Sequence, residues 1–306
     1  MIFLAVLGAL LLEQVRPMPY PNAAVRAIRA LANWAAPYIN AGMPKHGVWG
    51  WFALVVPLCV AVQGVCWLLA DINVVLEWAW ALVVLYFTMG FRQVSHYFTD
   101  IVRALRAGKW SDARAEIARW RQESQLEVEE GAVARLAIEE GLCAAHRFVF
   151  GPFFFAVLLG PVGAVLYRVS AILSECWSAK DRPELEHFAR FAGTAFEWID
   201  WLPSRLTATG FAVAGNFEDA FYCWRRQAAS WPNRLNGAIL ASGAGALGVR
   251  LGGPLRRLAY VEERPELGVA DEPDVESLDG TIGLIWRATV MWLIVILVIA
   301  LARLTG

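Results

Sequence analysis

Charged residues are scarce in this chain of 306 residues. Lys, Arg, Asp and Glu together make up 18% of it, whereas an ordinary soluble domain carries roughly 25%. Hydrophobic residues make up 58%, and the mean hydropathy is +0.46. This composition excludes a disordered chain, because disordered chains are rich in charge and poor in apolar residues. It indicates an integral membrane protein with sizeable polar portions.

An excess of positive charge is also absent. The 27 Lys and Arg residues balance 28 Asp and Glu residues, which argues against a nucleic-acid-binding protein. The five cysteines form no CxxC pair and have no accompanying histidine cluster, so neither a zinc site nor a disulfide framework is predicted. The chain also contains no P-loop, HExxH or GxSxG motif.

Long apolar runs are present instead. No Lys or Arg occurs between Lys45 and Arg92, and two apolar runs, 48–70 and 74–90, flank the polar break Asp71-Ile72-Asn73. At about 1.5 Å per residue, each run can cross a hydrocarbon core of about 30 Å, the second only just. The two runs therefore predict a transmembrane hairpin.

Apolar segments also lie at both ends of the chain. Residues 1–12 lack a basic n-region and no small-residue cleavage site follows them, so they predict a short uncleaved membrane segment. Residues 282–302 predict a terminal membrane helix.

A further apolar segment, 148–169, is interrupted by Gly151-Pro152 and by Gly160-Pro161. It could be a full span, or a broken segment that is re-entrant or interfacial. We favour the second alternative, because it lets the basic regions 91–147 and 170–281 both face the cytoplasm.

These two polar regions are expected to be helical. Their amphipathic patterns include helices near 185–201 and 204–222, followed by an acidic, solvated loop at 262–279. The sequence as a whole predicts an all-α, polytopic helical membrane protein with amphipathic and cytoplasmic helices. It is expected to form a single integral membrane domain, 1–306.

Arginines in glycine-rich or proline-rich contexts are the main candidates for chemistry. They are Arg114, Arg135, Arg205 and Arg250, and Arg135 can pair with Glu139 one helical turn later. Arginine suits bidentate binding of phosphate or carboxylate groups. Interfacial or structural ion pairs are the alternative.

Six strings, in order along the chain, resemble the CobD/CbiB family of cobalamin-biosynthesis membrane proteins. They are GKWSDAR (108–114), RLAIE (135–139), GPVGAVLYR (160–168), WLPSRLTA (201–208), AGALGVRLGG (244–253) and ERPELG (263–268). The resemblance implies a multi-pass protein of the bacterial inner membrane. Its implied activity is adenosylcobinamide-phosphate synthesis, in which ATP drives amide formation between adenosylcobyric acid and an aminopropanol phosphate.

The same resemblance implies the functional residues and partners. Glu139 would act as a base or metal ligand. The substrate-binding and phosphate-binding residues would be Arg114, Arg135, Tyr167, Arg205, Arg250, Gly252 and Gly253. ATP and Mg²⁺ are expected if the protein is an enzyme, with a corrinoid intermediate as substrate and the lipid bilayer as surroundings. No nucleic acid is expected.

Some positions depart from the family pattern. Where the family has EN and DG, this chain has Cys143-Ala144 and Arg147-Phe148, so carboxylates that could hold Mg²⁺ are missing. The string HRFVFGPFF at 146–154 is similar to AmpE, a membrane protein linked to β-lactamase regulation. The alternative function is therefore a non-enzymatic, AmpE-like membrane sensor, and the sequence leaves open whether the protein is an enzyme.

Overall fold

The structure is a computed structural model that describes residues 2–16, 18, 21–40, 43–121, 129–178, 185–256, 260–269 and 272–305. Within these residues the chain is almost entirely helical, and each of its strands is two residues long. Three helical stretches are long and apolar enough to cross a membrane, namely Lys45–Ile72, Gly131–Leu159 and Val275–Ala302. The predicted class, an all-α helical membrane protein, is confirmed.

The chain divides into two compact units. Unit 1 contains residues 1–90, 151–203 and 296–306, and unit 2 contains residues 91–150 and 204–295. Continuous helices cross these boundaries, because neither residue 203 nor residue 295 ends a helix. The expectation of a single membrane domain stays a prediction.

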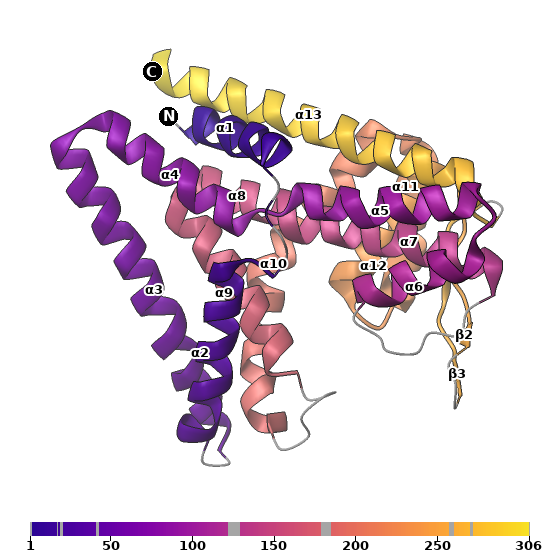
Figure 1. Cartoon of the computed structure of the whole chain (residues 1–306), viewed down its shortest axis with the longest axis horizontal. Coiled ribbons are helices and arrows are strands. Elements are labelled where there is room, and N and C mark those ends of the chain that lie inside the picture. The colour runs from indigo at the N-terminus through magenta and orange to yellow at the C-terminus, as the bar shows by residue number, and fades with distance from the viewer. Residues whose placement is uncertain are drawn as a thin grey trace. The chain divides into compact units, whose positions relative to one another are not determined.

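The first four helices belong to unit 1. They are α1 (Ile2–Val15), α2 (Ala23–Ile39), α3 (Pro44–Ile72) and α4 (Val74–Thr88). Asn73 ends α3 and caps α4, because its side chain accepts a hydrogen bond from the Val75 N–H. The helices α3 and α4 thus form the hairpin expected from the two apolar runs (Figure 1). By length and composition α3 can span a membrane, whereas α1 and α4 are shorter apolar helices.

The interrupted segment 148–169 is a broken helix. A π-helical turn, η1 (His146–Phe150), leads into α8 (Gly151–Leu159), and the chain reverses at Gly160 before α9 (Pro161–Cys176). Gly160 has a φ of 70°, which glycine adopts at little cost. A Cβ on Gly163 would collide with the Phe155 carbonyl oxygen, so only glycine lets α8 and α9 pack this closely.

The start of this apolar segment differs from the prediction. A membrane segment was expected from residue 148, but the apolar helical stretch begins at Gly131, because α7 (Glu130–Ala145) continues into η1 and α8. The most apolar window of this stretch is 61% buried inside the protein. Packing against protein, rather than exposure to lipid, accounts for part of its hydrophobicity.

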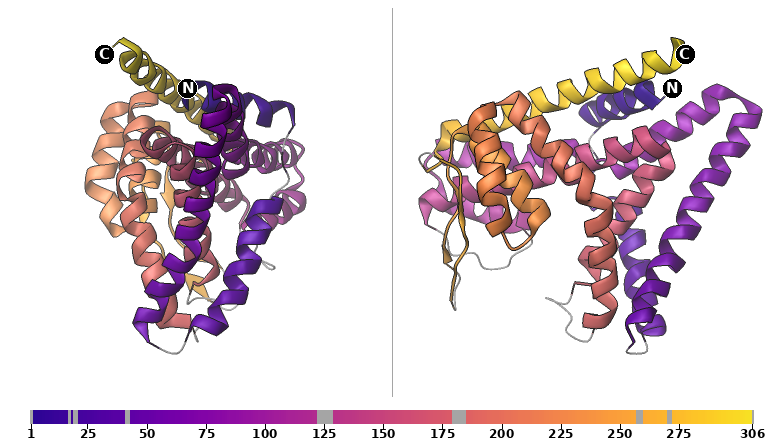
Figure 2. Two further views of the ribbon diagram at one scale, coloured as in Figure 1. Left: turned by 90° about the vertical axis from the view of Figure 1, so that its left-hand side faces the viewer. Right: turned by 180° about the vertical axis from the view of Figure 1, so that it is seen from behind.

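Unit 2 contains most of the remaining helices and all the strands of the described residues. Its helices are α5 (Phe91–Arg106), α6 (Trp110–Arg121), α7, α11 (Phe217–Gln227), a 3₁₀ turn η3 (Ala228–Ser230) and α12 (Arg234–Leu247). The helices α11 and α12 lie side by side (Figure 2, orange). Glycine allows this contact, because a Cβ on Gly245 would collide with the Asp219 carbonyl oxygen. The run of small residues in α12 is buried in the core of unit 2.

Two antiparallel strand pairs follow α12. Strand β1 (Leu251–Gly252) pairs with β4 (Glu266–Leu267), and β2 (Leu255–Arg256) pairs with β3 (Val261–Glu262). These pairs place residues 251–256 against residues 260–267, and we call these two segments the glycine loop. The glycine loop includes part of the expected acidic loop.

Two helix boundaries differ from the sequence-based expectation. Separate helices near 185–201 and 204–222 were expected, but α10 (Glu186–Ala214) runs through Pro203 without a break. Buried surroundings can support a proline within an apolar helix. The last helix, α13 (Val275–Thr305), begins earlier than residue 282, because the Asp274 carboxylate accepts a hydrogen bond from the Ser277 N–H at 2.8 Å and caps its first turn.

Candidate functional site

The strings RLAIE, GVRLGG and ERPELG meet in unit 2. Helix α7 places Arg135 and Glu139 one turn apart, and α12 ends at Gly248, whose φ of 66° turns the chain into the glycine loop. Gly252 and Gly253 also have positive φ, at 78° and 74°. A Cβ on Gly252 would collide with the Pro265 carbonyl oxygen, so this tight loop requires glycine.

The Glu139 carboxylate joins α7 to the glycine loop. Its Oε1 accepts a hydrogen bond from the Gly252 N–H at 2.8 Å, and its Oε2 accepts one from Arg264 Nη1, also at 2.8 Å. The side chains of Glu139 and Arg264 are 5% and 7% exposed. Both carboxylate oxygens are therefore engaged in a buried, charge-assisted contact.

Arg264 makes several contacts to the glycine loop. Its Nε donates to the Gly253 carbonyl at 3.1 Å and its Nη2 donates to the Gly252 carbonyl at 3.3 Å. Its guanidinium carbon lies 5.5 Å from the centre of the Trp231 ring. Arg264 was not predicted as a site residue, although it is the single basic residue of the acidic stretch 262–279.

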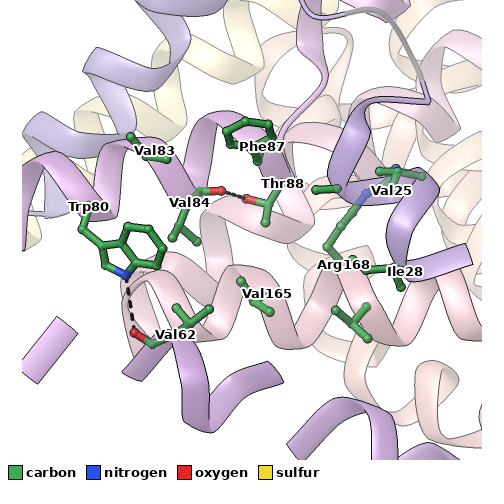
Figure 3. A pocket seen from close by; sticks show the side chains of 12 residues that line it. Val25, Ile28, Val62, Trp80, Val83, Val84, Phe87, Thr88, Val165 and Arg168 are labelled. Carbon is green, nitrogen blue, oxygen red and sulfur yellow. Dashed lines mark hydrogen bonds between the residues drawn. The ribbon is translucent and has the colours of Figure 1, made fainter. Parts of the chain in front are cut away.

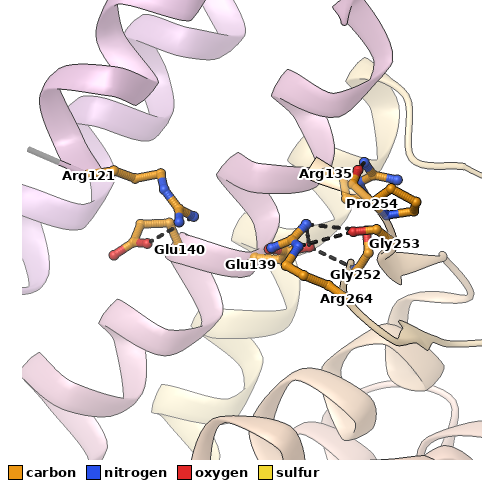
Figure 4. A network of polar contacts seen from close by, with 8 residues as sticks. All are labelled: Arg121, Arg135, Glu139, Glu140, Gly252, Gly253, Pro254 and Arg264. Carbon is orange, nitrogen blue, oxygen red and sulfur yellow. Dashed lines mark hydrogen bonds and ion pairs between the residues drawn. The ribbon is translucent and has the colours of Figure 1, made fainter. Parts of the chain in front are cut away.

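Arg135 contacts another part of the same loop. Its Nη2 donates to the Pro254 carbonyl at 3.2 Å, and its Nη1 lies 3.1 Å from the position that a Cβ on Gly253 would occupy. Arg135 and Glu139 therefore do not pair with each other as expected. Arg264 occupies the Glu139 carboxylate, and Arg135 contacts the Pro254 carbonyl instead (Figure 4).

Arg250 and Glu266 add exposed charges to this cluster. Arg250 Nη1 lies 3.9 Å from Glu266 Oε2, and their side chains are 45% and 61% exposed. Glu266 lies in β4, opposite Gly252, so both charges are close to the glycines. We call Arg135, Glu139, Arg250, Arg264 and Glu266, together with Gly252 and Gly253, the loop site. Its three arginines outnumber its two carboxylates, so the site suits an anion.

The other expected arginines come from different elements of unit 2. Arg114 lies on α6 and is half-buried, and its buried Nε has no hydrogen-bond partner among the described residues. Arg205 lies on α10, where burial lowers the pKa of its guanidinium from the usual value.

Tyr167 belongs to unit 1 and is fully buried. Its hydroxyl donates to Asp200 Oδ1 at 2.9 Å, and its ring stacks on Phe155. A Cβ on Gly151 would collide with this ring, so Tyr167 is packed tightly in the core of its unit. Asp200, which was not predicted as a site residue, is a buried partner that fixes the hydroxyl.

Carboxylates for a metal ion are few. Among the described residues, no three His, Cys, Asp or Glu side chains gather in a way that could hold one. Glu139 is occupied by Arg264, whereas Glu266 is exposed beside the loop. Mg²⁺ often uses one or two carboxylates together with substrate phosphates, so Glu266 fits such a limited role.

Comparisons with known proteins identify relatives along most of the chain. A family model described as "CobD/Cbib protein" matches residues 2–285. A protein of Stutzerimonas stutzeri named "Cobalamin biosynthesis protein CobD" is 31% identical over 300 residues, which cover 97% of each chain. A Chromobacterium violaceum protein with the same name is 35% identical over 240 residues, covering 78% of this chain and 76% of the relative.

No solved structure matches the chain. The resemblance to AmpE is not supported by these relatives, and it stays a hypothesis from sequence. The match over residues 2–285 confirms the resemblance that the six strings indicated. The chain belongs to the CobD/CbiB family.

Proposed function

We propose that this protein acts in cobalamin biosynthesis at the inner membrane of a bacterium, as an adenosylcobinamide-phosphate synthase. The reaction would join the carboxyl group of adenosylcobyric acid to the amine of an aminopropanol phosphate. The observation that carries the proposal is the loop site, where three family-like strings place Arg135 and Arg250 beside a glycine turn.

The chemistry requires an activated carboxyl group. The substrate carboxylate would attack the γ-phosphorus of ATP, forming an acyl phosphate and releasing ADP. The amine would then attack the acyl carbon, forming the amide bond and releasing inorganic phosphate and a proton. Every reactant carries phosphate or carboxylate groups, so a site rich in arginine would hold them and stabilise the charge that is transferred.

Arg135 and Arg250 would bind phosphate groups in this scheme. Arg135 donates to the Pro254 carbonyl through Nη2, and an arginine has five N–H donors in total. Arg250 is 45% exposed, so its guanidinium lies at the surface, where a phosphate group could reach it. Glu266 would contribute one ligand to Mg²⁺ carried by the nucleotide.

Glu139 and Arg264 would position the loop in this scheme. The two carboxylate oxygens of Glu139 accept hydrogen bonds from Gly252 and Arg264. Glu139 would therefore have to give up one of these hydrogen bonds before it could bind a metal ion or a proton. The role of Glu139 as a base or metal ligand stays a prediction.

The direct test uses the full chain in detergent micelles with adenosylcobyric acid, an aminopropanol phosphate, ATP and Mg²⁺. We expect ATP-dependent formation of the amide, detected by mass spectrometry. We expect Arg135→Gln and Arg250→Gln each to raise KM for the phosphorylated substrate about tenfold or more, as the loss of a charge-assisted hydrogen bond does.

The matched control is Arg119→Gln, which removes an exposed arginine of α6 that pairs with Glu116. It should leave KM unchanged. Absence of product from the folded wild-type protein, or an equal effect of all three substitutions, would contradict the proposal.

A further inference from the structure

Gln227, the last residue of α11, forms two hydrogen bonds with Gly268, the residue that follows the glycine loop. Its Nε2 donates to the Gly268 carbonyl at 2.9 Å, and its Oε1 accepts from the Gly268 N–H at 2.6 Å. A side-chain amide carries its donors on the nitrogen and its acceptor on the oxygen, so this contact uses both ends of the carboxamide. It therefore fixes both the position and the direction of the backbone at Gly268.

Gly268 is also the point where the two ends of the glycine loop meet. Its φ is 110°, a conformation that glycine adopts far more readily than other residues. A Cβ on Gly268 would collide with the carbonyl oxygen of Val249, the residue just before Arg250. The contact with Gln227 spans 41 positions of sequence. It thus ties this meeting point to a helix that the loop does not contain.

The segment 264–268 is consequently held at both of its ends. Arg264 is held by the Glu139 carboxylate, at 2.8 Å from Nη1 to Oε2, and Gly268 is held by Gln227. Glu266 lies midway between the two anchors, in β4, and its side chain is 61% exposed. The place of this carboxylate beside Arg250 therefore depends on both anchors.

Polar side chains in unit 1 make a different use of their hydrogen bonds. A cavity of about 300 Å³ there is lined by residues of α2, α3, α4 and α9. At this cavity Trp80 Nε1 donates to the Val62 carbonyl at 3.4 Å, and the Thr88 hydroxyl donates to the Val84 carbonyl at 3.0 Å (Figure 3). Those contacts join one helix to another or lie within one helix. Gln227 differs, because both of its hydrogen bonds hold a residue next to the loop site.

We propose that Gln227 is a positioning residue of the loop site. It holds Glu266 beside Arg250, so that the carboxylate can bind the Mg²⁺ of a nucleotide while the guanidinium binds a phosphate group of the same nucleotide. This inference rests on the proposed function. The carboxamide of Gln227 is engaged with Gly268, so Gln227 acts through the loop and not on the substrates.

The first measurement is amide hydrogen exchange of the full chain in detergent micelles, which requires no activity. Gln227→Met keeps the length of the side chain and removes both hydrogen bonds. We expect the Gly268 amide to exchange about tenfold faster or more in this variant, as judged by mass spectrometry of the peptide that contains it. The matched control is Ser230→Ala, which removes a hydrogen bond from the Ser230 hydroxyl to the Gln227 carbonyl. It should exchange like the wild type.

The second measurement is the Kd of a non-hydrolysable ATP analogue, determined by calorimetry with Mg²⁺ and with a chelator instead. We expect Mg²⁺ to strengthen binding by the wild type and by Ser230→Ala. Gln227→Met should raise the Kd of the Mg²⁺ complex about tenfold. It should change the Kd of the metal-free analogue by no more than about twofold, because Glu266 matters only when the metal is present.

A double-mutant cycle separates positioning from a general loss of structure. Glu266→Gln alone should also weaken binding of the Mg²⁺ complex. Adding Gln227→Met to it should cause no further loss, because the carboxylate that Gln227 positions is then absent. A purely structural role of Gln227 would instead weaken both forms of the analogue and would add to the effect of Glu266→Gln.

Any of three results would overturn this inference. They are unchanged exchange at Gly268 in Gln227→Met, equal weakening of the analogue with and without Mg²⁺, and wild-type binding that Mg²⁺ does not strengthen. If Gln227→Met does not fold, Gln227→Glu keeps the acceptor for the Gly268 N–H, loses the donor, and should show the same selective weakening.

The proposed function is judged separately, by amide formation. A wild type that binds the Mg²⁺ complex as expected but forms no amide contradicts the proposed function alone. A wild type that forms the amide, with Gln227→Met binding the Mg²⁺ complex equally well, contradicts the role of Gln227 alone.

Discussion

At the scale of single residues, the buried pair of Glu139 and Arg264 connects α7 to the glycine loop. The pair is separated by 125 positions in sequence and is almost fully buried. Burial of two charges is costly, and the hydrogen bonds to Gly252 and Gly253 offset part of that cost. Such a pair is weak evidence for stability, but its loss leaves one buried charge without compensation.

Replacing Arg264 should therefore be strongly destabilising. We expect Arg264→Met to lower the free energy of unfolding by about 3–5 kcal/mol, because the Glu139 carboxylate is then buried without its charged partner. Arg264→Lys should lower the free energy of unfolding by less, because lysine retains the positive charge although it lacks the planar set of N–H donors of the guanidinium. Denaturant titration in detergent measures both variants. A value for Arg264→Met within about 0.5 kcal/mol of the wild type would show that the pair is not formed.

Gly252 should tolerate no side chain. Its φ of 78° and the close approach of the Pro265 carbonyl oxygen to the place of a Cβ both disfavour Gly252→Ala. We expect this variant to lose the Glu139 contact and to lower the free energy of unfolding by about 2 kcal/mol or more. The control is Gly280→Ala in α13, where the nearest atom to a Cβ lies 3.7 Å away. Equal stability of the two variants would contradict the described loop.

At the scale of elements, helix ends are set by local contacts that hydropathy does not report. Helix α13 begins at Val275 because Asp274 caps it, and α9 begins after the reversal at Gly160. Hydrogen bonds from the backbone and hydroxyl of Ser277 lower the pKa of Asp274 below its usual value. Because the charged carboxylate is the better acceptor, the cap is complete at neutral pH and is lost as the pH falls through this lowered pKa.

The cap can be measured by hydrogen exchange. We expect Asp274→Ala to speed amide exchange in the first turn of α13 about fivefold at neutral pH, which corresponds to a lost helix cap. The wild type should approach the variant in acid, once Asp274 is protonated. Glu276→Gln, two positions further along the chain, is the control and should exchange like the wild type. A difference between wild type and Asp274→Ala that persists unchanged in acid would exclude the cap.

At the scale of the whole molecule, the apolar runs predicted the helical membrane class and the pairing of α3 with α4 correctly. That α4 crosses the membrane stays a prediction, because α4 is a shorter apolar helix than the candidate spans. Hydropathy could not locate the start of the stretch at Gly131, because burial in protein and burial in lipid both favour apolar residues. Spacing on one helix suggested that Arg135 pairs with Glu139, yet the partner of Glu139 is Arg264 from the glycine loop. Local sequence carries no information about a contact between such distant positions. Both residues lie in family-like strings, yet Arg264 was not predicted as a site residue.

The same limit applies to the site residues. Arg135, Glu139, Arg250, Gly252 and Gly253 lie together at the loop site, which their positions in sequence alone did not establish. Tyr167, however, lies in the core of unit 1, and its hydroxyl donates a hydrogen bond to Asp200. A glycine-rich string that ends in Tyr-Arg is equally consistent with tight helix packing and with binding, and here α8 and α9 use it for packing.

The most direct test of the proposed synthase function is complementation of a bacterial strain that lacks its own adenosylcobinamide-phosphate synthase. We predict that the wild-type chain restores growth that depends on cobalamin. Arg119→Gln should restore it equally, and Arg250→Gln should restore it poorly although the protein reaches the membrane. Failure of the wild-type chain, when it is folded and present in the membrane, would contradict the function proposed for this member of the CobD/CbiB family.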